Sequence, residues 1–497
     1  CNASDTFAGI GVDAEDTLGN VSVDADTSAG QQANSSQSLF DGKVSGEAII
    51  AVAGSLATSG KSSGGASFAM IYAGSDYLAS MANVTTDLSG ALQVQAYNAT
   101  ETLAIAVGVA GSDSADSIVG SGTAVIDRGT VKAQILGTAT SHSTLKAKSL
   151  DLTAQKAGGY YSLAGALAVS KDKALGAAVA LSDIEQSVEA RLQYADVTLD
   201  GAALIQAAQQ SAVRTAAVAG ATSGKATYTG SVTYNRIAGS TNALLANSLF
   251  SAKALNLQSA EPGLGASIWS LAGAVSASTG NTAVGAAVAT NLLTATRNAS
   301  LLDSTVNLSG DLNVLSSLDG EIYGIAVGLT GSSKGGLNLS SVNNIIQGSD
   351  TATIGNSTVT LTGTGDVTVK ASSDSGLTIG SLAGSAGAAG KTSIGAAVAY
   401  NEIAANRTAS ITGSTVKGFQ DAQVRSGADQ RIDTLAITAG GAGDLAVNGA
   451  VTTSVLKGTD SALVSDSTVQ SDNLDVRVAG DRTLNALALT LSGSGKV

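Results

Sequence analysis

The residues most able to do chemistry in this 497-residue chain are few and lie far apart. His142 is the only histidine, Cys1 the only cysteine and Trp269 the only tryptophan. A nucleophilic triad needs a histidine beside a nucleophile and a carboxylate, and a zinc site needs several nitrogen or sulfur ligands. His142 lies in the Ser/Thr-rich stretch 138–144, where we expect an exposed structural residue. The sequence therefore predicts no catalytic site, no metal site and no cofactor.

Carboxylates are the remaining candidates, because two of them could form a glycosidase pair. β-Solenoids that cleave polysaccharides also present aromatic side chains on which sugars stack, whereas aromatic residues make up only 3% of this chain. No EF-hand loop and no Gly-Gly-x-Gly-x-Asp calcium repeat occurs. A polysaccharide-binding or polysaccharide-cleaving protein is thus the alternative interpretation.

Charge and hydropathy exclude two classes of partner. The formal net charge is −13 and no basic run occurs, so the face that neutralises nucleic-acid phosphates is missing. The longest apolar stretches, such as 379–390, are interrupted by Gly and Ser and are shorter than the roughly 20 residues of a membrane helix. We expect neither nucleic-acid binding nor membrane insertion.

One polar position recurs at a nearly fixed interval. Its members are Ser182, Asn235, Asn291, Asn344, Asn401 and Ser454, separated by 53, 56, 53, 57 and 53 residues. At the turn of a β-solenoid, an asparagine can adopt the left-handed conformation and stack its amide on the next one. We predict a structural ladder along one edge of the molecule, and a ligand-binding row is the alternative.

The elements that position these residues are repeats. The pattern apolar-x-apolar-x-small has its central residue at Val94, Leu152, Ile205, Leu257, Val314, Val369, Val424 and Val476. The intervals are 58, 53, 52, 57, 55, 55 and 52 residues, so we place repeat starts near these positions. Repeats of this kind bury a core only by stacking on their neighbours.

Each repeat also contains three further segments in a constant order. They are a small-residue strand such as Leu271-Ala-Gly-Ala-Val275, a strand such as Gly395-Ala-Ala-Val-Ala-Tyr-Asn401, and a Ser-Thr-Val step such as Ser414-Thr-Val416. The interleaved Gly, Ser, Thr and Val favour strands over helices. We predict an all-β, elongated parallel β-helix over residues 1–497. We expect two coils of about 27 residues per repeat, hence roughly eighteen coils and a rod of about 85 Å.

The two ends of the chain lack the polar caps that solenoids need. We therefore expect a segment of a longer polypeptide, or a subunit that stacks end to end on like subunits. A loop insertion is predicted near 26–42, where the repeat pattern is interrupted. Cys1 at the first position is compatible with a lipidated mature terminus.

The repeat style resembles that of the shafts of large bacterial surface adhesins. Units built from Leu-x-Val-x-Ala, Leu-Ala-Gly-Ala, Gly-Ala-Ala-Val-Ala-x-Asn and Ser-Thr-Val are similar to filamentous-haemagglutinin and leukotoxin-like exoproteins exported by two-partner secretion. The resemblance implies a right-handed β-helix on the bacterial cell surface, with a structural or adhesive role in filaments or biofilm. It also implies contact with adjoining repeats, a host or neighbouring cell surface, or a polysaccharide. The secretion domain of such exoproteins is not seen.

Overall fold

The computed structural model describes residues 6–11, 17–18, 21–26, 47–259, 265–373 and 375–495, with side chains from residue 49 onward. Every regular element in these ranges is a β-strand, and the strands form two sheets in which neighbours run parallel. The predicted all-β parallel solenoid is therefore confirmed. Cys1 lies outside the described residues, as does the predicted insertion near 26–42, apart from Asp26, which ends β3.

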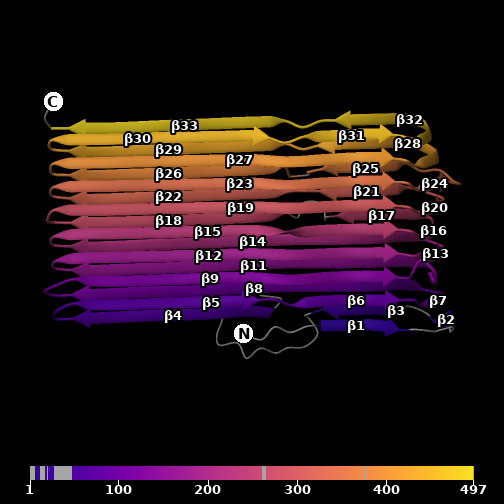
Figure 1. Cartoon of the computed structure of the whole chain (residues 1–497), viewed down its shortest axis with the longest axis horizontal. Helices are drawn as coiled ribbons and strands as arrows, with labels where there is room; N and C mark the ends of the chain where they lie inside the picture. Colours follow the sequence, from indigo (N-terminus) through magenta and orange to yellow (C-terminus); the bar gives the residue numbers. More distant parts are fainter. Residues whose placement is uncertain are drawn as a thin grey trace.

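The first sheet contains one long strand, or two collinear shorter strands, from each repeat. Its members are β1 (Thr6–Gly11), β5 (Ser63–Ala73), β6 (Asp76–Ala82), β9 (Ser117–Leu136), β12 (Lys173–Gln193), β15 (Ala226–Ala246), β19 (Thr282–Leu302), β23 (Gly335–Gly355), β27 (Thr392–Thr412), β30 (Leu445–Lys457) and β31 (Asp460–Ser465). Figure 1 shows that these strands run along the longest dimension of the molecule and that their rows are stacked across it, with little twist between rows.

The second sheet is built in the same way. Its long members are β3 (Val21–Asp26), β4 (Glu47–Ser59), β8 (Ala91–Ser112), β11 (Ser149–Ser170), β14 (Ala202–Ser223), β17 (Ala254–Ser259), β18 (Ala266–Ser278), β21 (Leu312–Ser317), β22 (Gly320–Ser332), β25 (Val367–Ser372), β26 (Leu377–Ala389), β28 (Thr415–Gly427), β29 (Gln430–Ala442), β32 (Thr468–Val478) and β33 (Arg482–Ser494).

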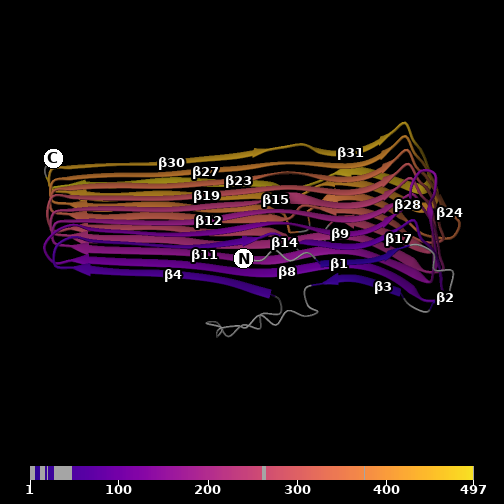
Figure 2. The same cartoon turned by 60° about the horizontal axis from the view of Figure 1, so that its bottom comes forward.

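Short strands join the two sheets at one end of the molecule. They are β2 (Thr17–Leu18), β7 (Thr85–Leu88), β10 (Ser143–Ala147), β13 (Ala195–Leu199), β16 (Leu249–Ala252), β20 (Thr305–Leu308) and β24 (Thr358–Leu361), and the beginnings of β28 and β32 continue their column. Seen from another direction, β2 and β24 lie at the end opposite the tight turns (Figure 2).

One repeat forms one coil, so the expectation of two coils per repeat is wrong. Leu152 pairs with Val94 on one side and with Ile205 on the other, and these are equivalent positions of adjacent repeats. The apolar-x-apolar segment and the small-residue strand after it, expected as separate short strands, form single strands of 22 residues in β8, β11 and β14, because their inward-outward alternation continues without a break. The described part therefore contains nine rows in each sheet, not eighteen coils, and the stack is about 43 Å high at 4.8 Å per row.

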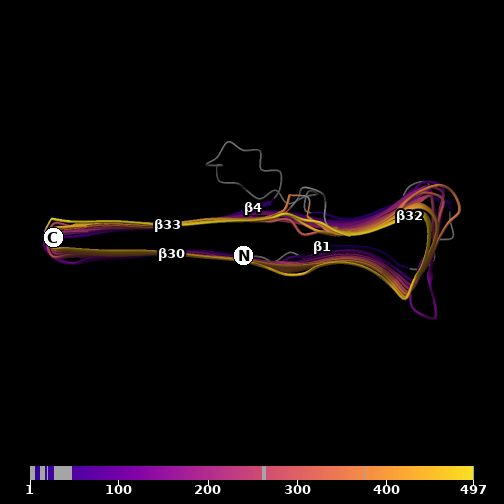
Figure 3. The same ribbon diagram turned by 90° about the horizontal axis from the view of Figure 1, so that it is seen from above.

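The thickness of the molecule changes along each coil, as the view down the stack shows (Figure 3). The wide end, which we call the lobe, is filled by Leu, Ile, Val and Phe side chains such as Leu92, Ile135 and Phe250. The thin end, which we call the blade, encloses mainly alanines such as Ala274 and Ala289. Between them a waist is filled by Ile184, Leu293 and similar residues. Side-chain volume thus sets the distance between the two sheets.

The sheets approach closely in the blade. Ser162 Oγ in β11 donates to the carbonyl of Leu181 in β12 at 3.3 Å, and Asn448 Nδ2 in β30 donates to the carbonyl of Leu491 in β33 at 3.1 Å. A Cβ on Gly108 would lie 2.6 Å from a methyl carbon of Val119 on the opposite sheet. Sheets separated by ordinary side chains lie about 10 Å apart, which a single serine cannot span. The interior here is therefore filled mainly by Gly, Ala, Ser and Thr, with a few larger residues such as Val119 and Asn448.

Candidate functional site

The predicted Asn/Ser row forms a single column inside the molecule. Ser182, Asn235, Asn291, Asn344, Asn401 and Ser454 are register partners in successive strands of the first sheet. The first three asparagines donate from Nδ2 to the Oδ1 of the next, at 2.8 Å from Asn235 to Asn291, 2.7 Å from Asn291 to Asn344 and 2.9 Å from Asn344 to Asn401. Flat sheets of many strands are commonly stabilised by such side-chain ladders.

The same column also joins the two sheets. Asn235, Asn291 and Asn401 donate in addition to hydroxyls of the second sheet, those of Thr215, Ser270 and Ser381, at 2.7–2.8 Å. All four asparagines are at most 1% exposed. The column lies at the boundary between blade and waist. Because its side chains are buried, solvent has no access to it. A row of amides closed in this way has no free surface for a ligand.

The expected location of this ladder, at a turn on the edge of the molecule, is wrong. The four asparagines lie within β15, β19, β23 and β27, and none has a positive φ. Among the described residues other than glycine, those with positive φ are Asn83, Tyr194, Asn247, Asp303, Asn356 and Asp466, which precede the short strands or the start of β32. The interior location follows from the continuous inward-outward alternation of the long strands, which places every second residue between the sheets.

The Ser-Thr-Val step provides the ladder at the turn. Ser304 Oγ donates to the carbonyl of Leu302 at 2.6 Å and accepts the backbone N–H of Ser248 at 3.2 Å. The same pair of contacts recurs at Ser248, Ser357, Ser414 and Ser467. Each serine closes its own turn and bonds the backbone of the preceding coil, which explains why the residue type recurs at this place in the repeat.

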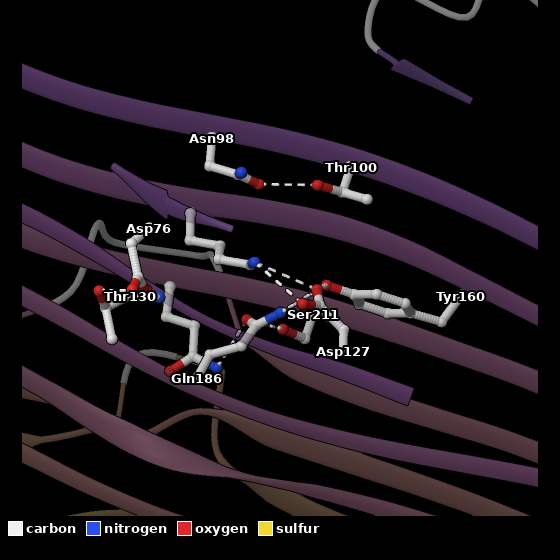
Figure 4. Close-up of polar contacts among 10 residues, drawn as sticks. Asp76, Asn98, Thr100, Asp127, Thr130, Tyr160, Gln186 and Ser211 are labelled. Carbon is white, nitrogen blue, oxygen red and sulfur yellow. Dashed lines mark hydrogen bonds and ion pairs between the residues drawn. The ribbon is translucent and has the colours of Figure 1, made fainter. Parts of the chain in front are cut away.

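A second buried cluster contains groups that could act as acid and base. Asp127 accepts hydrogen bonds from Tyr160 at 2.5 Å and Gln186 at 2.8 Å, and its carboxylate lies 3.1 Å from Lys156 Nζ (Figure 4). Burial, followed by the Asp127 charge, raises the pKa of Tyr160 well above its usual value. Lys156 and Asp127 are 1% exposed and Tyr160 is fully buried. The cluster has the residue types of a proton-transfer site but no access for a substrate.

An alternating column of charges lies between waist and lobe. Arg297, Asp350, Arg407 and Asp460 are register partners in the first sheet. Arg407 lies 3.3 Å from Asp460 Oδ1, and Asp350 accepts a hydrogen bond from Ser316 of the second sheet. Burial raises the pKa of Asp350 to about 7, although Ser316, Arg407 and Arg297 oppose the shift. The spacings of 53, 57 and 53 residues could have revealed this column in the sequence.

The outer surface of the second sheet, near the boundary of blade and waist, holds a solvent-exposed candidate site. Trp269 and Tyr323 are register partners in β18 and β22, their ring centroids lie 5.8 Å apart, and Trp269 is 50% exposed. Next to them is a shallow groove of about 770 Å³, to which Gly380 and Asp433 also contribute. Arg431 Nε donates to Asp433 at 2.6 Å. Trp269, which stands alone in the sequence, is thus paired with a second aromatic ring.

The remaining sequence candidates form no larger site. His142 lies 2.8 Å from Asp196 at the lobe end and is 31% exposed in its side chain. Among the described residues, no group of three or more His, Cys, Asp or Glu side chains is placed to hold a metal ion. The described ranges also contain no helix long and apolar enough to cross a membrane.

Comparison with known proteins gives no match for this chain. No protein-family model, no curated protein and no solved structure is significantly similar to it. The columns described above are therefore the basis for the functional inference.

Proposed function

We propose that this protein is the repetitive shaft of an extracellular filament or adhesin, with a structural and adhesive role on a bacterial cell surface. The observation that supports it is the continuity of register through all nine described rows. The Asn column, the Ser turns and the Arg/Asp column each take their partners from the adjacent rows. These three columns of buried polar residues therefore bond adjacent rows to one another.

The chemistry of the buried clusters agrees with this role. Asp127, Lys156 and Tyr160 have side chains that can act as acids or bases in enzymes, but here Asp127 bonds to the other two inside the protein. The partners in the proposed role are adjoining repeats or like subunits along the stack, and a host or neighbouring cell surface. The similarity of repeat style to filamentous-haemagglutinin and leukotoxin-like exoproteins motivates the location on the cell surface.

Electron microscopy combined with fibre diffraction of the native material tests the shaft. A shaft built by stacking these rows gives a reflection near 4.8 Å along the fibre axis, because the strands lie across that axis. Rods of fixed length on cells would support an adhesin shaft, and long filaments would support a polymer. Isolated compact particles without a 4.8 Å axial reflection would contradict both forms of the proposal.

A second candidate function, polysaccharide binding, is favoured by the paired rings of Trp269 and Tyr323 beside a groove with polar residues at Asp433 and Asn485. Because Trp269 is the only tryptophan, its fluorescence reports directly on this groove. Binding of soluble glucan or galactan fragments should quench or shift that emission. Tyr323→Ala should raise the dissociation constant from this titration at least tenfold. Unchanged emission across a panel of neutral and acidic polysaccharides would reject this candidate.

A further inference from the structure

The outer face of the second sheet in the blade is apolar over a large area. Four neighbouring outward columns run through nine rows, beginning at Val52, Gly54, Leu56 and Thr58 of β4 and continuing to β33. Of these 36 positions, four in each of nine rows, all except Thr58 and Thr222 are Gly, Ala, Val, Leu or Ile. We call this surface the apolar face.

The area of the apolar face exceeds that of the largest apolar patch on a typical monomeric protein. Four columns about 6.6 Å apart and nine rows about 4.8 Å apart cover about 1,100 Å². The largest apolar patch of a typical monomer covers about 300–600 Å², and each partner in a stable protein complex buries about 800 Å². Several side chains on the face are well exposed, among them Leu56 at 77% and Val107 at 47%. The face is large enough to form one complete interface.

The second of the four columns alternates between glycine and valine. From β4 to β26 it reads Gly54, Val107, Gly165, Val218, Gly273, Val327 and Gly384. A Cβ added at Gly273 would have methyl carbons of Val218 as its nearest neighbours, 3.6 Å away, so the space outward from the sheet is open. The column therefore presents ridges and notches that repeat every two rows, about 9.6 Å.

This alternation is complementary to itself. We propose that two copies of this chain associate laterally through the apolar face, with the valine ridges of one copy in the glycine notches of the other. A two-fold axis parallel to the strands, between the rows of Val218 and Gly273, places Val218 of each copy opposite Gly273 of the other. The same operation places Val107 opposite Gly384 and Gly165 opposite Val327. A symmetric contact of this kind is closed and produces a defined dimer.

The lateral interface goes beyond the proposed shaft. Shaft formation concerns stacking along the coil axis, whereas this contact lies on the side of the blade. A result that contradicts one proposal therefore does not contradict the other. A lipid surface or an unrelated apolar partner would respond to the total apolar area and not to the order of Gly and Val along the column. The alternation therefore favours a second copy as the occupant.

Gly273→Val separates these possibilities by sedimentation velocity over a range of protein concentrations. The added side chain fills a notch without overlapping the backbone, since its Cβ meets Val218 at an ordinary contact distance. We expect the dissociation constant of the lateral dimer to rise at least tenfold, although the substitution makes the face more apolar. The exchange Val218→Gly with Gly273→Val moves the ridge by one row, again opposes valine to glycine across the two-fold axis, and should restore the dimer.

Gly230→Val is the matched control, because Gly230 faces outward on the opposite side of the blade with no atom near the place its Cβ would take. It should leave the dimer unchanged. A chain that never associates laterally, or a dimer strengthened by Gly273→Val and not restored by the exchange, would overturn the proposal. Binding to phosphatidylcholine vesicles that is equal for the native chain and Gly273→Val, without a dimer, would also overturn it in favour of a lipid surface.

Discussion

The lobe and the blade are parts of the same coils, yet they distribute apolar residues in opposite ways. The lobe has Leu, Ile, Val and Phe inside and polar pairs outside, such as Gln95 with Asp151 at 2.6 Å and Asn313 with Asn256 at 2.8 Å. The blade has Ala, Ser and Thr inside, and Leu and Val outside. Strand β19 shows the change within one segment, since its inward residues run from Ala287 through Asn291 and Arg297 to Leu301.

This difference indicates what stabilises each region. Burial of a Leu or Ile side chain contributes about 1.5–3 kcal/mol, so the lobe has the core of an ordinary domain. Alanines contribute far less, and buried hydroxyls in the blade such as those of Ser231, Thr233 and Ser393 have no hydrogen-bond partner among the described residues. The blade therefore depends on its backbone hydrogen bonds, on the Asn column and, as proposed above, on a partner that covers its outer face.

The largest effect is expected from pH, through the charge column that separates waist from lobe. Asp350 has a pKa of about 7 in the folded chain because of burial, with Arg297 and Arg407 as its column neighbours and Asp319 nearby. The folded state thus keeps a proton that the unfolded chain releases above about pH 4. The free energy of unfolding should fall as the pH rises from about 4 through about 7, by as much as about 4 kcal/mol.

The control for this pH dependence is Asp350→Asn, which cannot ionise. Urea unfolding of both chains from pH 4 to pH 8 gives a difference curve in which the contributions of other carboxyl groups cancel. A flat difference curve would mean that Asp350 titrates as it does in the unfolded chain. The column would then be an ion pair in the usual protonation states.

Truncation of leucines should reveal the contrast between the two regions most directly. Leu257 and Leu271 lie in adjacent strands of the same row, but Leu257 is fully buried in the lobe whereas Leu271 is 37% exposed on the blade. Leu257→Ala should lower the free energy of unfolding by about 3 kcal/mol, and Leu271→Ala by less than about 1 kcal/mol. Equal losses in denaturant titrations of the monomeric chain would contradict the inverted arrangement of the blade.

The Asn column should matter less than the lobe core but more than any surface contact. Asn291→Ala removes the donor to Asn344 and the acceptor for Asn235, and leaves buried polar groups unpaired. We expect a loss of about 2 kcal/mol in the free energy of unfolding. Asn291→Ser should cost less, because serine occupies the same column at Ser182 and Ser454. If Asn291→Ala is nearly silent, the column has no stabilising role.

The lobe was the part of the fold most open to prediction from the sequence. Its apolar-x-apolar pattern is strong, and Val94, Leu152 and Ile205, the first predicted central residues, are direct register partners. The strands of the blade were predicted from their small residues, but as short separate segments, whereas β11 runs without a break from lobe to blade. The location of the Asn column depended on the length of the strands, which composition does not determine, whereas the Arg/Asp column could have been predicted from its spacing.

The smallest effect is expected from a network of ion pairs on the outer surface of the first sheet. Arg236 lies 2.9 Å from Asp183 and 3.0 Å from Glu185, and Arg128 contacts the same two carboxylates. A hydrogen bond from Arg236 lowers the pKa of Glu185 most, and one from Arg128 lowers it further. These side chains are 28–47% exposed, so water and salt screen their attraction. Arg236→Gln should therefore cost only about 0.5 kcal/mol at low ionic strength and almost nothing in 1 M NaCl, measured by urea unfolding. A loss above about 2 kcal/mol that persists in salt would show that this network, and not the interior columns, holds the adjacent rows of the waist together.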